Sequence, residues 1–269
     1  MNTESVNIKT KGISDATTEE MLYMINDEDA TVAGVVRSVI PQVAKLVEAG
    51  VSTIKNGGRI FYCGCGTSGR IAVADAAECP PTYGVSRDLV NAIIAGGEKA
   101  MINASEGCED SREKGIETFE KVGVKAGDLV IGISAAGRAP FVLAFMEKAK
   151  EVGVFVGALV NNTDTEMSKV ADLTIELLTG AEAIKGSTRM KAGTSQKLVL
   201  NMFSTTLFIR MGCTYQNYMV NMIPNNIKLR GRAVSMVMEI TGLEEEKAKK
   251  ILESCEWDIR SAIKIGLEK

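Results

Sequence analysis

Three segments of the sequence bring together glycines, hydroxyls and basic residues, the groups that bind phosphate. The first is CGCGTSGR (63–70), where Gly66, Thr67 and Ser68 stand just before an expected helix. Glycines let backbone N–H groups approach an anion closely, and the start of a helix carries partial positive charge. The loop lacks the lysine of GxxxxGK[ST], and its last glycine does not fit GxGxxG. We therefore expect it to bind a phosphate or a sugar phosphate.

A second segment repeats this pattern further along the chain. RIFYCGCGTSGRIAVADAA (59–77) aligns with DLVIGISAAGRAPFVLAFM (128–146), so that Gly69 matches Gly137. Two strand–loop–helix units in one parallel sheet place both loops at the carboxyl ends of strands, where open α/β sheets bind ligands. The ligand-binding residues predicted from the second copy are Ser134, Gly137 and Arg138.

A third segment, GSTRMKAGTS (186–195), precedes an apolar helix expected near residues 194–211. Its hydroxyls and cations at the start of a helix suit a phosphorylated ligand. We expect Ser187, Thr188 and Lys191 to take part in binding.

Two carboxylates are candidates for acid–base chemistry. Glu78 lies in AAECPPTYG (76–84), where two prolines are expected to stop a helix and form a rigid turn that aims Glu78 into a cleft. Glu109 lies in ASEGCEDS (104–111), with Glu106 and Asp110, at an expected helix start. Two carboxylates in different environments can divide the roles of acid and base. The alternatives are a solvated glutamate in a last helical turn and acidic residues that favour a helix start.

The composition excludes several classes of protein. The absence of histidine rules out histidine bases, Ser-His-Asp triads and histidine metal ligands. The six cysteines form no CxxC pair, so we expect reduced, buried thiols rather than a zinc or redox site. The net charge of −3 shows no footprint for nucleic acid, and no apolar run approaches the ~18 residues of a membrane span. Because the N-terminus is polar and unlike a signal peptide, we expect a cytoplasmic protein without membrane or nucleic-acid partners.

Short apolar runs alternate with helical patterns and predict a doubly wound, mostly parallel α/β sheet. The expected strands are 60–63, 91–95, 129–133, 154–159 and 173–177, and the helices between them lie near 69–77, 111–121, 139–151 and 165–170. Residues 18–56 are expected to be helical, with a kink or break at Pro41. Two short amphipathic helices are expected in the tail after Gly242. The expected division is a helical segment (1–57), a ligand-binding domain (58–225) and a helical domain (226–269).

Several of these segments together resemble the N-acetylmuramic acid 6-phosphate etherases, a family with the sugar isomerase (SIS) fold. The matching stretches are TTEEM, INDED, GTSGR, DAAECPPTYG, IAGGEKA, EGCEDS, GRAPFV and GSTRMKAGTSQKLVLNM, between residues 14 and 242. The resemblance implies a three-layer α/β/α fold with a parallel five-stranded sheet, N-terminal helices and a small C-terminal helical domain similar to a ubiquitin-associated (UBA) domain. It also implies a homodimer whose active sites are lined by both subunits.

The resemblance further implies a lyase reaction. The family cleaves the D-lactyl ether of N-acetylmuramic acid 6-phosphate, a phosphorylated amino sugar, in cell-wall sugar recycling. The C2 proton of the open-chain sugar leaves, the C3 ether follows, and water adds to the unsaturated intermediate. No metal, nicotinamide or other cofactor is needed. By position in the motifs, Glu78 is the acid that protonates the departing lactate and Glu109 is the base.

The sequence also departs from the family pattern. Ala136 and Ala139 stand where the family's second loop has serine and threonine, and Asn221 replaces an aspartate. Cys65 and Cys108 stand where alanine is common. Fewer hydroxyls in the second loop leave open a protein that binds phosphosugars without turnover, as a sensor or regulator. An aldose–ketose isomerase is a third possibility, against which the ECPPT and EGxED segments argue.

Overall fold

The computed structural model describes residues 2–104 and 107–268 and divides the chain into two compact units. The first unit comprises residues 1–76 and 88–205, and the second comprises residues 77–87 and 206–269. The N-terminal helices thus belong to the same unit as the sheet. The division of the sequence at residues 57 and 225 stays a prediction.

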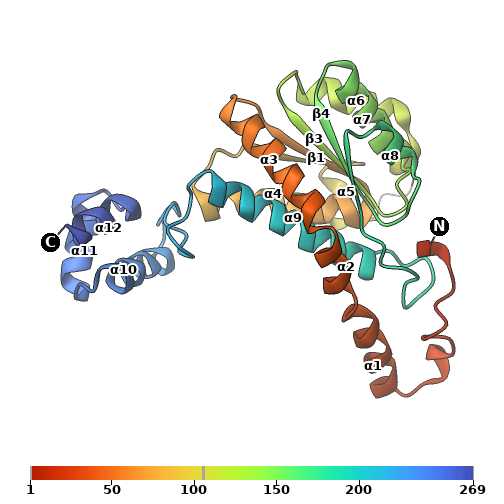
Figure 1. Cartoon of the computed structure of the whole chain (residues 1–269), viewed down its shortest axis with the longest axis horizontal. Coiled ribbons are helices and arrows are strands. Elements are labelled where there is room, and N and C mark those ends of the chain that lie inside the picture. Colours follow the sequence, from red (N-terminus) through yellow and green to blue (C-terminus); the bar gives the residue numbers. More distant parts are fainter. Residues whose placement is uncertain (1, 105–106, 269) are drawn as a thin grey trace. The chain divides into compact units, whose positions relative to one another are not determined.

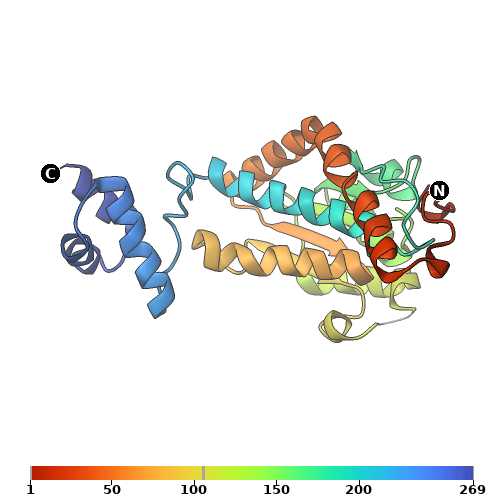
Figure 2. The ribbon, with the colours of Figure 1, turned by 90° about the horizontal axis from the view of Figure 1, so that it is seen from below.

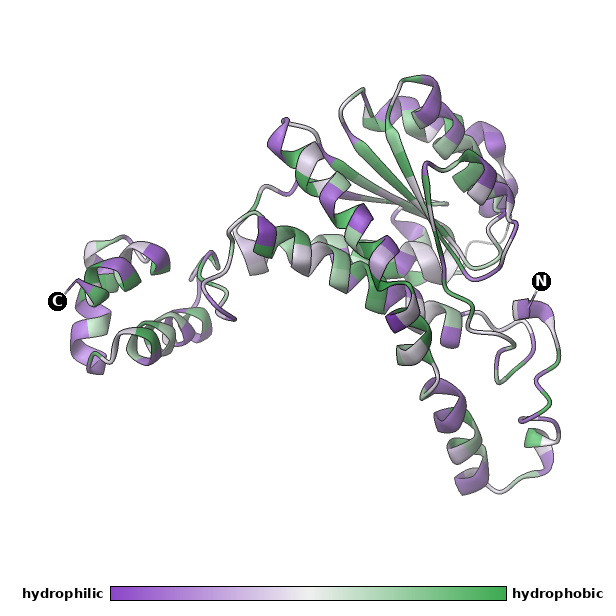
Figure 3. Cartoon of the chain, viewed as in Figure 1, coloured by the Kyte–Doolittle hydropathy of each residue, from purple (hydrophilic) through white to green (hydrophobic). Residues whose placement is uncertain are grey.

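The first unit is built on a parallel five-stranded sheet with the strand order β2-β1-β3-β4-β5 (Figure 1). Both faces are covered by helices, which is why the strands are apolar nearly throughout, as Figure 3 shows. The predicted strands are confirmed to within one or two residues at each end. Their bounds are β1 (Ile60–Gly64), β2 (Val90–Ile94), β3 (Leu129–Ser134), β4 (Phe155–Val160) and β5 (Leu173–Glu176).

Helices cover the sheet in two layers (Figure 2). On one face, Phe119 and Phe145 pack edge to face with ring centroids 5.3 Å apart, in a buried cluster that includes Phe61 and Val130. On the other face, the ring of Tyr62 meets the edge of Phe203 at 6.2 Å. The predicted three-layer α/β/α architecture is therefore confirmed. The helices after β1 are α4 (Gly66–Tyr83), α5 (Lys99–Ile102), α6 (Arg112–Val122), α7 (Pro140–Glu151), α8 (Glu166–Val170) and α9 (Lys191–Arg210).

The N-terminal segment forms three helices, α1 (Thr18–Asp29), α2 (Val32–Ser38) and α3 (Ile40–Lys55), after two short 3₁₀ turns (Asn2–Glu4 and Ile13–Asp15). Thr17 caps α1 in a reciprocal capping box with Glu20. The predicted break at Pro41 is confirmed, because the proline lies in the first turn of α3 and the helices bend by 60° there. No single helix within residues 2–104 and 107–268 is long and apolar enough to cross a membrane. Two helical segments joined by a bend, Thr18–Ser38 and Ile40–Lys55, are together long and apolar enough, by length and composition only.

Helix α4 differs from the prediction at both ends. It begins at Gly66 instead of residue 69, so Gly66, Thr67 and Ser68 form its first turn. It also continues through Pro80 and Pro81 to Tyr83, so the expected helix stop before the prolines is wrong. Each proline lacks an N–H and cannot make the usual bond to the residue four positions earlier. The loss is confined to the last turn, since Gly84 ends the helix with φ of 64° and donates to the Pro80 carbonyl at 2.9 Å.

The second unit contains a three-helix core of its own. Its helices are α10 (Ile227–Thr241), α11 (Glu245–Ser254) and α12 (Ile259–Leu267), and the two predicted tail helices correspond to α11 and α12. Gly242 ends α10 in the left-handed conformation, with φ of 71°. Buried apolar side chains from all three helices, among them Val237, Leu252 and Ala262, form one cluster.

We predict that Ala139→Ser stabilises the protein. Ala139 is the N-cap of α7 with extended backbone angles, and its side chain cannot accept a hydrogen bond from the helix. A serine there can accept one from the first turn, which is typically worth ~1 kcal/mol. Urea denaturation should show a rise of this size in the free energy of unfolding. Ala136→Ser, in the same loop but not at the cap, is the control, and an equal rise in both variants would contradict the capping explanation.

Candidate active site

The turn from β1 into α4 is too tight for side chains at two glycines. A Cβ on Gly64 would lie 2.8 Å from the Gly69 nitrogen, and a Cβ on Gly69 would lie 2.6 Å from Cγ1 of Ile94. Gly66 adopts φ of 52°, a left-handed conformation that glycine permits. The first N–H groups of α4 have no partner within the helix and carry its partial positive charge. This turn is therefore suited to an anion, and phosphate binding by Gly66, Thr67 and Ser68 stays a prediction.

The loop after β3 lies beside the loop after β1, because the two strands pair in register with Gly64 opposite Ile133. The echo seen in the sequence is thus a pair of adjacent β–α turns. The hydroxyl of Ser134 accepts a hydrogen bond from the N–H of Gly137 at 3.2 Å. A Cβ on Gly137, where φ is 65°, would lie 2.5 Å from Cβ of Thr165. Arg138 follows on the exposed side of the turn.

A buried chain of side-chain amides and hydroxyls joins these turns to α9. The hydroxyl of Ser68 donates to Oε1 of Gln196 at 2.8 Å, and Nε2 of Gln196 donates to Oδ1 of Asn161 at 2.9 Å. Nδ2 of Asn161 in turn donates to the hydroxyl of Ser195 at 2.9 Å. Since the single hydroxyl proton of Ser68 is used here, Ser68 has only its backbone N–H to offer a ligand. Thr67 is half-buried, and its hydroxyl has no hydrogen-bond partner among the described residues.

The start of α9 is already occupied by a carboxylate of the protein. Both oxygens of the fully buried Glu182 accept hydrogen bonds, from the N–H groups of Lys191 and Ala192, each at 2.9 Å. This cap satisfies the helix start and opposes a second anion there. Ser187 and Thr188, in the turn before α9, are half-buried. A Cβ on Gly193 would lie 3.2 Å from Cγ2 of Thr67 and 3.5 Å from the Thr188 carbonyl oxygen. The hydroxyls of this turn therefore lie close to the start of α4.

Lys191 lies in a buried ion pair with Glu28 of α1. The ammonium contacts Oε2 of Glu28, which also accepts a hydrogen bond from Nδ2 of Asn7 at 2.8 Å, while Nζ of Lys9 lies 3.4 Å from Oε1. Burial acts to raise the pKa of the Glu28 carboxyl, but the donors Lys191, Asn7 and Lys9 and the charge of Lys191 outweigh it and lower the pKa. Binding phosphate would require Lys191 to leave this pair, so its predicted role stays a prediction.

Glu109 lies within electrostatic reach of the first glycine turn. It is exposed in the 3₁₀ turn Cys108–Asp110, just before α6, whose N-cap is Ser111. Burial raises the pKa of the Cys65 thiol to about 12, and the negative charges of Glu109 and Asp110 and the Cys108 thiol add to the rise. The carboxylate of Glu109 is therefore within electrostatic reach of the residue that joins β1 to α4. Glu106 lies outside the described residues.

Glu78 is an exposed residue inside α4, five positions before the helix ends at Tyr83, and belongs to the second unit. It is therefore not on a proline-made turn, contrary to the prediction. Its partnership with Glu109 stays a prediction.

The described residues contain no group of three or more histidine, cysteine, aspartate or glutamate side chains placed to hold a metal ion.

Comparison with known proteins gives the family. Residues 42–150 match the glucokinase regulatory protein N-terminal SIS domain, 117–206 the SIS domain and 232–264 a UBA-like domain. An N-acetylmuramic acid 6-phosphate etherase of Clostridium botulinum (strain Loch Maree) is 48% identical over 97% of this chain and 86% of its own length. An N-acetylmuramic acid 6-phosphate etherase of Geobacillus sp. (strain WCH70) is 42% identical over 98% of this chain and 89% of its own length. The chain belongs to the N-acetylmuramic acid 6-phosphate etherase family.

Solved structures agree on the fold. A phosphoheptose isomerase of Francisella tularensis aligns with a TM-score of 0.55 and 18% identity, over 72% of this chain and all of its own. A phosphoheptose isomerase of Neisseria gonorrhoeae aligns with a TM-score of 0.54 and 17% identity, over 71% of this chain and 98% of its own. The predicted etherase family, SIS fold and UBA-like tail are therefore confirmed.

The structure also brings in residues that the sequence did not single out. Glu28, Glu182 and Asn161 are buried and hold, respectively, Lys191, the start of α9 and the polar chain of Ser195 and Gln196. Glu28 lies in the family segment INDED, and Gln196, the partner of Asn161, lies in GTSQK. Neither segment reveals the partner.

We predict that Glu28→Gln destabilises the protein at neutral pH. The variant leaves the Lys191 ammonium buried without a counter-charge, which typically costs about 3–5 kcal/mol. Because the pKa of Glu28 is lowered in the folded state, its carboxylate stabilises the protein at pH values above the ordinary pKa of a carboxyl group. This stabilisation is lost as the pH falls through the lowered pKa. Urea denaturation should therefore give a free energy of unfolding well below that of the parent at about pH 7. At about pH 3 the difference from the parent should be smaller.

Asp27→Asn is the matched control, since Asp27 is the exposed neighbour of Glu28 on α1. It should unfold like the parent at both pH values. A Glu28→Gln variant as stable as the parent at neutral pH would contradict the importance of the ion pair.

Proposed function

We propose that this chain cleaves the D-lactyl ether of N-acetylmuramic acid 6-phosphate to give N-acetylglucosamine 6-phosphate and D-lactate, in cell-wall sugar recycling. The observation that carries the proposal is the likeness of 42–48% identity to etherases over 97–98% of the chain. The phosphate-suited turn at α4 and the carboxylate of Glu109 beside it support the same chemistry.

The substrate phosphate binds at the start of α4. Backbone N–H groups of Gly66, Thr67 and Ser68 donate to it, and the hydroxyls of Thr67, Ser187 and Thr188 line the same place. Ser134, Gly137 and Arg138 of the neighbouring turn contribute to sugar binding, with the Ser134 hydroxyl fixed as an acceptor within its loop. The start of α9 does not compete for the phosphate, because Glu182 caps it.

Glu109 removes the proton from C2 of the open-chain sugar. The electron pair left on C2 forms a double bond to C3 as the C3 ether bond breaks, and Glu78 protonates the lactate oxygen that departs. Water then adds across the double bond, with its hydroxyl on C3 and a proton on C2. The sum is hydrolysis of the ether, and carboxylates suffice for every proton transfer.

A second candidate is a protein on the same fold that binds phosphosugars without turnover. Ala136 and Ala139 bring no hydroxyl to the second turn, and the single hydroxyl proton of Ser68 is already donated within the protein. Such a binder needs the anion site but neither glutamate.

We predict that the chain releases D-lactate from N-acetylmuramic acid 6-phosphate and that Glu109→Gln abolishes the release. Loss of a general base typically lowers the rate by about 10²–10⁴-fold. An enzymatic D-lactate assay measures turnover, and calorimetry with N-acetylglucosamine 6-phosphate measures binding, which the variant should retain because Glu109 does not hold the phosphate.

The control is Glu113→Gln, an exposed carboxylate in the first turn of α6 four residues away. It should keep turnover near the parent level. Binding without any lactate from the parent chain would instead support the non-catalytic candidate, and loss of binding in Glu109→Gln would contradict its role as base.

We further propose that the chain acts as a homodimer in the cytoplasm. Large apolar side chains of the N-terminal segment are exposed, Ile8 to 83% and Leu22 and Tyr23 of α1 each to 63%, which is typical of a surface covered by a partner. All six cysteines are free, as expected in a reducing compartment. Light scattering at micromolar concentration should give a molar mass of about twice the chain mass of 28.8 kDa. The substitution Leu22→Asp should lower the measured mass towards that of a single chain, because it would bury a charge at the interface. A monomeric parent chain would refute the dimer.

A further inference from the structure

Strand β2 forms a free edge of the sheet, since it pairs with β1 alone among the described strands. The N–H of Ile60 donates to the Leu89 carbonyl at 2.9 Å and that of Ala95 donates to the Gly64 carbonyl at 3.1 Å. In a parallel ladder every second residue bonds the same neighbour, so the odd-numbered residues of β2 face β1. The N–H and C=O of Ala92 and the N–H of Ile94 therefore point to the open side, where they can pair with another strand.

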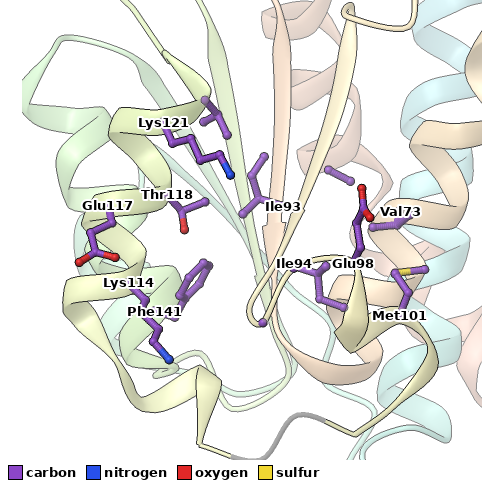
Figure 4. Close-up of a pocket in the computed structure, with 14 residues that line it drawn as sticks. Val73, Ile93, Ile94, Glu98, Met101, Lys114, Glu117, Thr118, Lys121 and Phe141 are labelled. Atoms are coloured by element: carbon purple, nitrogen blue, oxygen red, sulfur yellow. The ribbon is translucent and has the colours of Figure 1, made fainter.

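A cavity of about 530 Å³ runs along this edge (Figure 4). Lys114, Lys121 and Phe141, from α6 and α7, line it on one face of the sheet. Val73 of α4 and Met101 of α5 line it on the other face. The cavity thus wraps around the edge of the sheet and opens to both faces.

This shape selects the form of the ligand. An added strand contacts both faces of an edge, because its successive side chains point to opposite faces while its backbone pairs with the edge groups. Neighbouring residues of β2 already show this alternation. Ile93 belongs to the cluster under α7, whereas Ile94 lies so close to α4 that a Cβ on Gly69 would strike it.

The two faces differ in charge. Lys114 and Lys121 stand seven positions apart on α6, about 10 Å along the helix, and neither forms an ion pair with another described residue. Glu117 also lines this face, but in Figure 4 its carboxylate points away from the cavity while the ammonium of Lys121 points into it. The opposite face is apolar at Val73, Ile94 and Met101, with Glu98 as its charged member. Acidic side chains fit the first face and apolar side chains fit the second.

We propose that this edge groove binds an extended segment of another protein in which acidic and apolar residues alternate. A second copy of β2 is a poor occupant, because its sequence VNAII carries no acidic residue and a two-fold pairing would bring the lysines of both α6 helices together. The lysines instead discourage self-association and favour an acidic strand. The proposal is independent of the etherase reaction.

The test is a fluorescence-anisotropy titration with a labelled peptide of about eight residues, alternating glutamate and valine. The parent protein should bind it saturably, and more weakly as salt increases. Lys121→Glu should weaken binding roughly tenfold, because an attraction becomes a repulsion. Lys45→Glu, the same change at an exposed position on α3, should leave it unaltered, and none of these variants should change lactate release.

A backbone test separates strand pairing from simple charge attraction. Hydrogen exchange on the parent protein should show slower exchange at the amides of Ala92 and Ile94 when the peptide is bound. Ala92→Pro, which removes an edge-facing N–H at a position where proline is tolerated, should weaken binding several-fold. Absence of saturable binding up to ~1 mM, equal binding of a lysine–valine peptide, or unchanged exchange at Ala92 and Ile94 would each overturn the proposal.

Discussion

The hydrogen bonds of the buried Asn161 side chain hold the parts of the candidate site in one arrangement. Asn161 directly follows β4, and its backbone N–H donates to the Ala135 carbonyl after β3. Its Nδ2 donates to the Leu177 carbonyl after β5 and to Ser195 of α9, while its Oδ1 accepts from Gln196, which in turn accepts from Ser68 of α4. Asn161 thus links the ends of three strands to the start of α9, and through Gln196 to the start of α4. Because an unpaired amide in so dry a place costs free energy, any displacement of one element is opposed by the others.

This arrangement leaves the two helix starts in different electrostatic states. Glu182 fills the start of α9 with its own carboxylate, whereas no described carboxylate accepts from the N–H groups at the start of α4. A dianion is therefore repelled at the start of α9 and attracted at the start of α4. The proposed role of Ser187 and Thr188 therefore depends on their hydroxyls, in a turn close to Thr67, and not on the dipole of α9. The proposed phosphate site is therefore centred on α4, and the segment GSTRMKAGT would contribute to it through side chains.

Much of the fold could be predicted because its signals are local. Strands buried on both faces appear as short apolar runs, and Thr17 with Glu20 marks a helix start by type and spacing alone. The true ends of α4 could not be found in this way. Its first turn contains two glycines and its last turn two prolines, and the tight packing of Gly69 on Ile94 that fixes this turn is a tertiary contact.

The buried charges of the site were beyond prediction for the same reason. Glu28 and Lys191 are 163 residues apart in the sequence, and Glu182 meets the start of α9 across an irregular segment. A glutamate that will be buried has the same local surroundings as one that will be exposed. The tight glycine turn at the start of α4, which suits an anion, was predictable from glycine and hydroxyl spacing, whereas the ion pair of Lys191 with Glu28 required the fold.

The cysteines of the first glycine turn show how the environment selects chemistry. Cys63 is fully buried in β1, and burial raises the pKa of its thiol well above the ordinary value. Cys65 has a pKa of about 12, so its thiolate is scarce at neutral pH, and it is the thiolate that attacks disulfides and binds metals. The carboxylates of Glu109, the proposed base, and of Asp110 help to suppress ionisation of Cys65. The thiols of Cys63 and Cys65 are therefore poor nucleophiles and metal ligands at neutral pH, which agrees with the proposal that Glu109 carries the proton transfer.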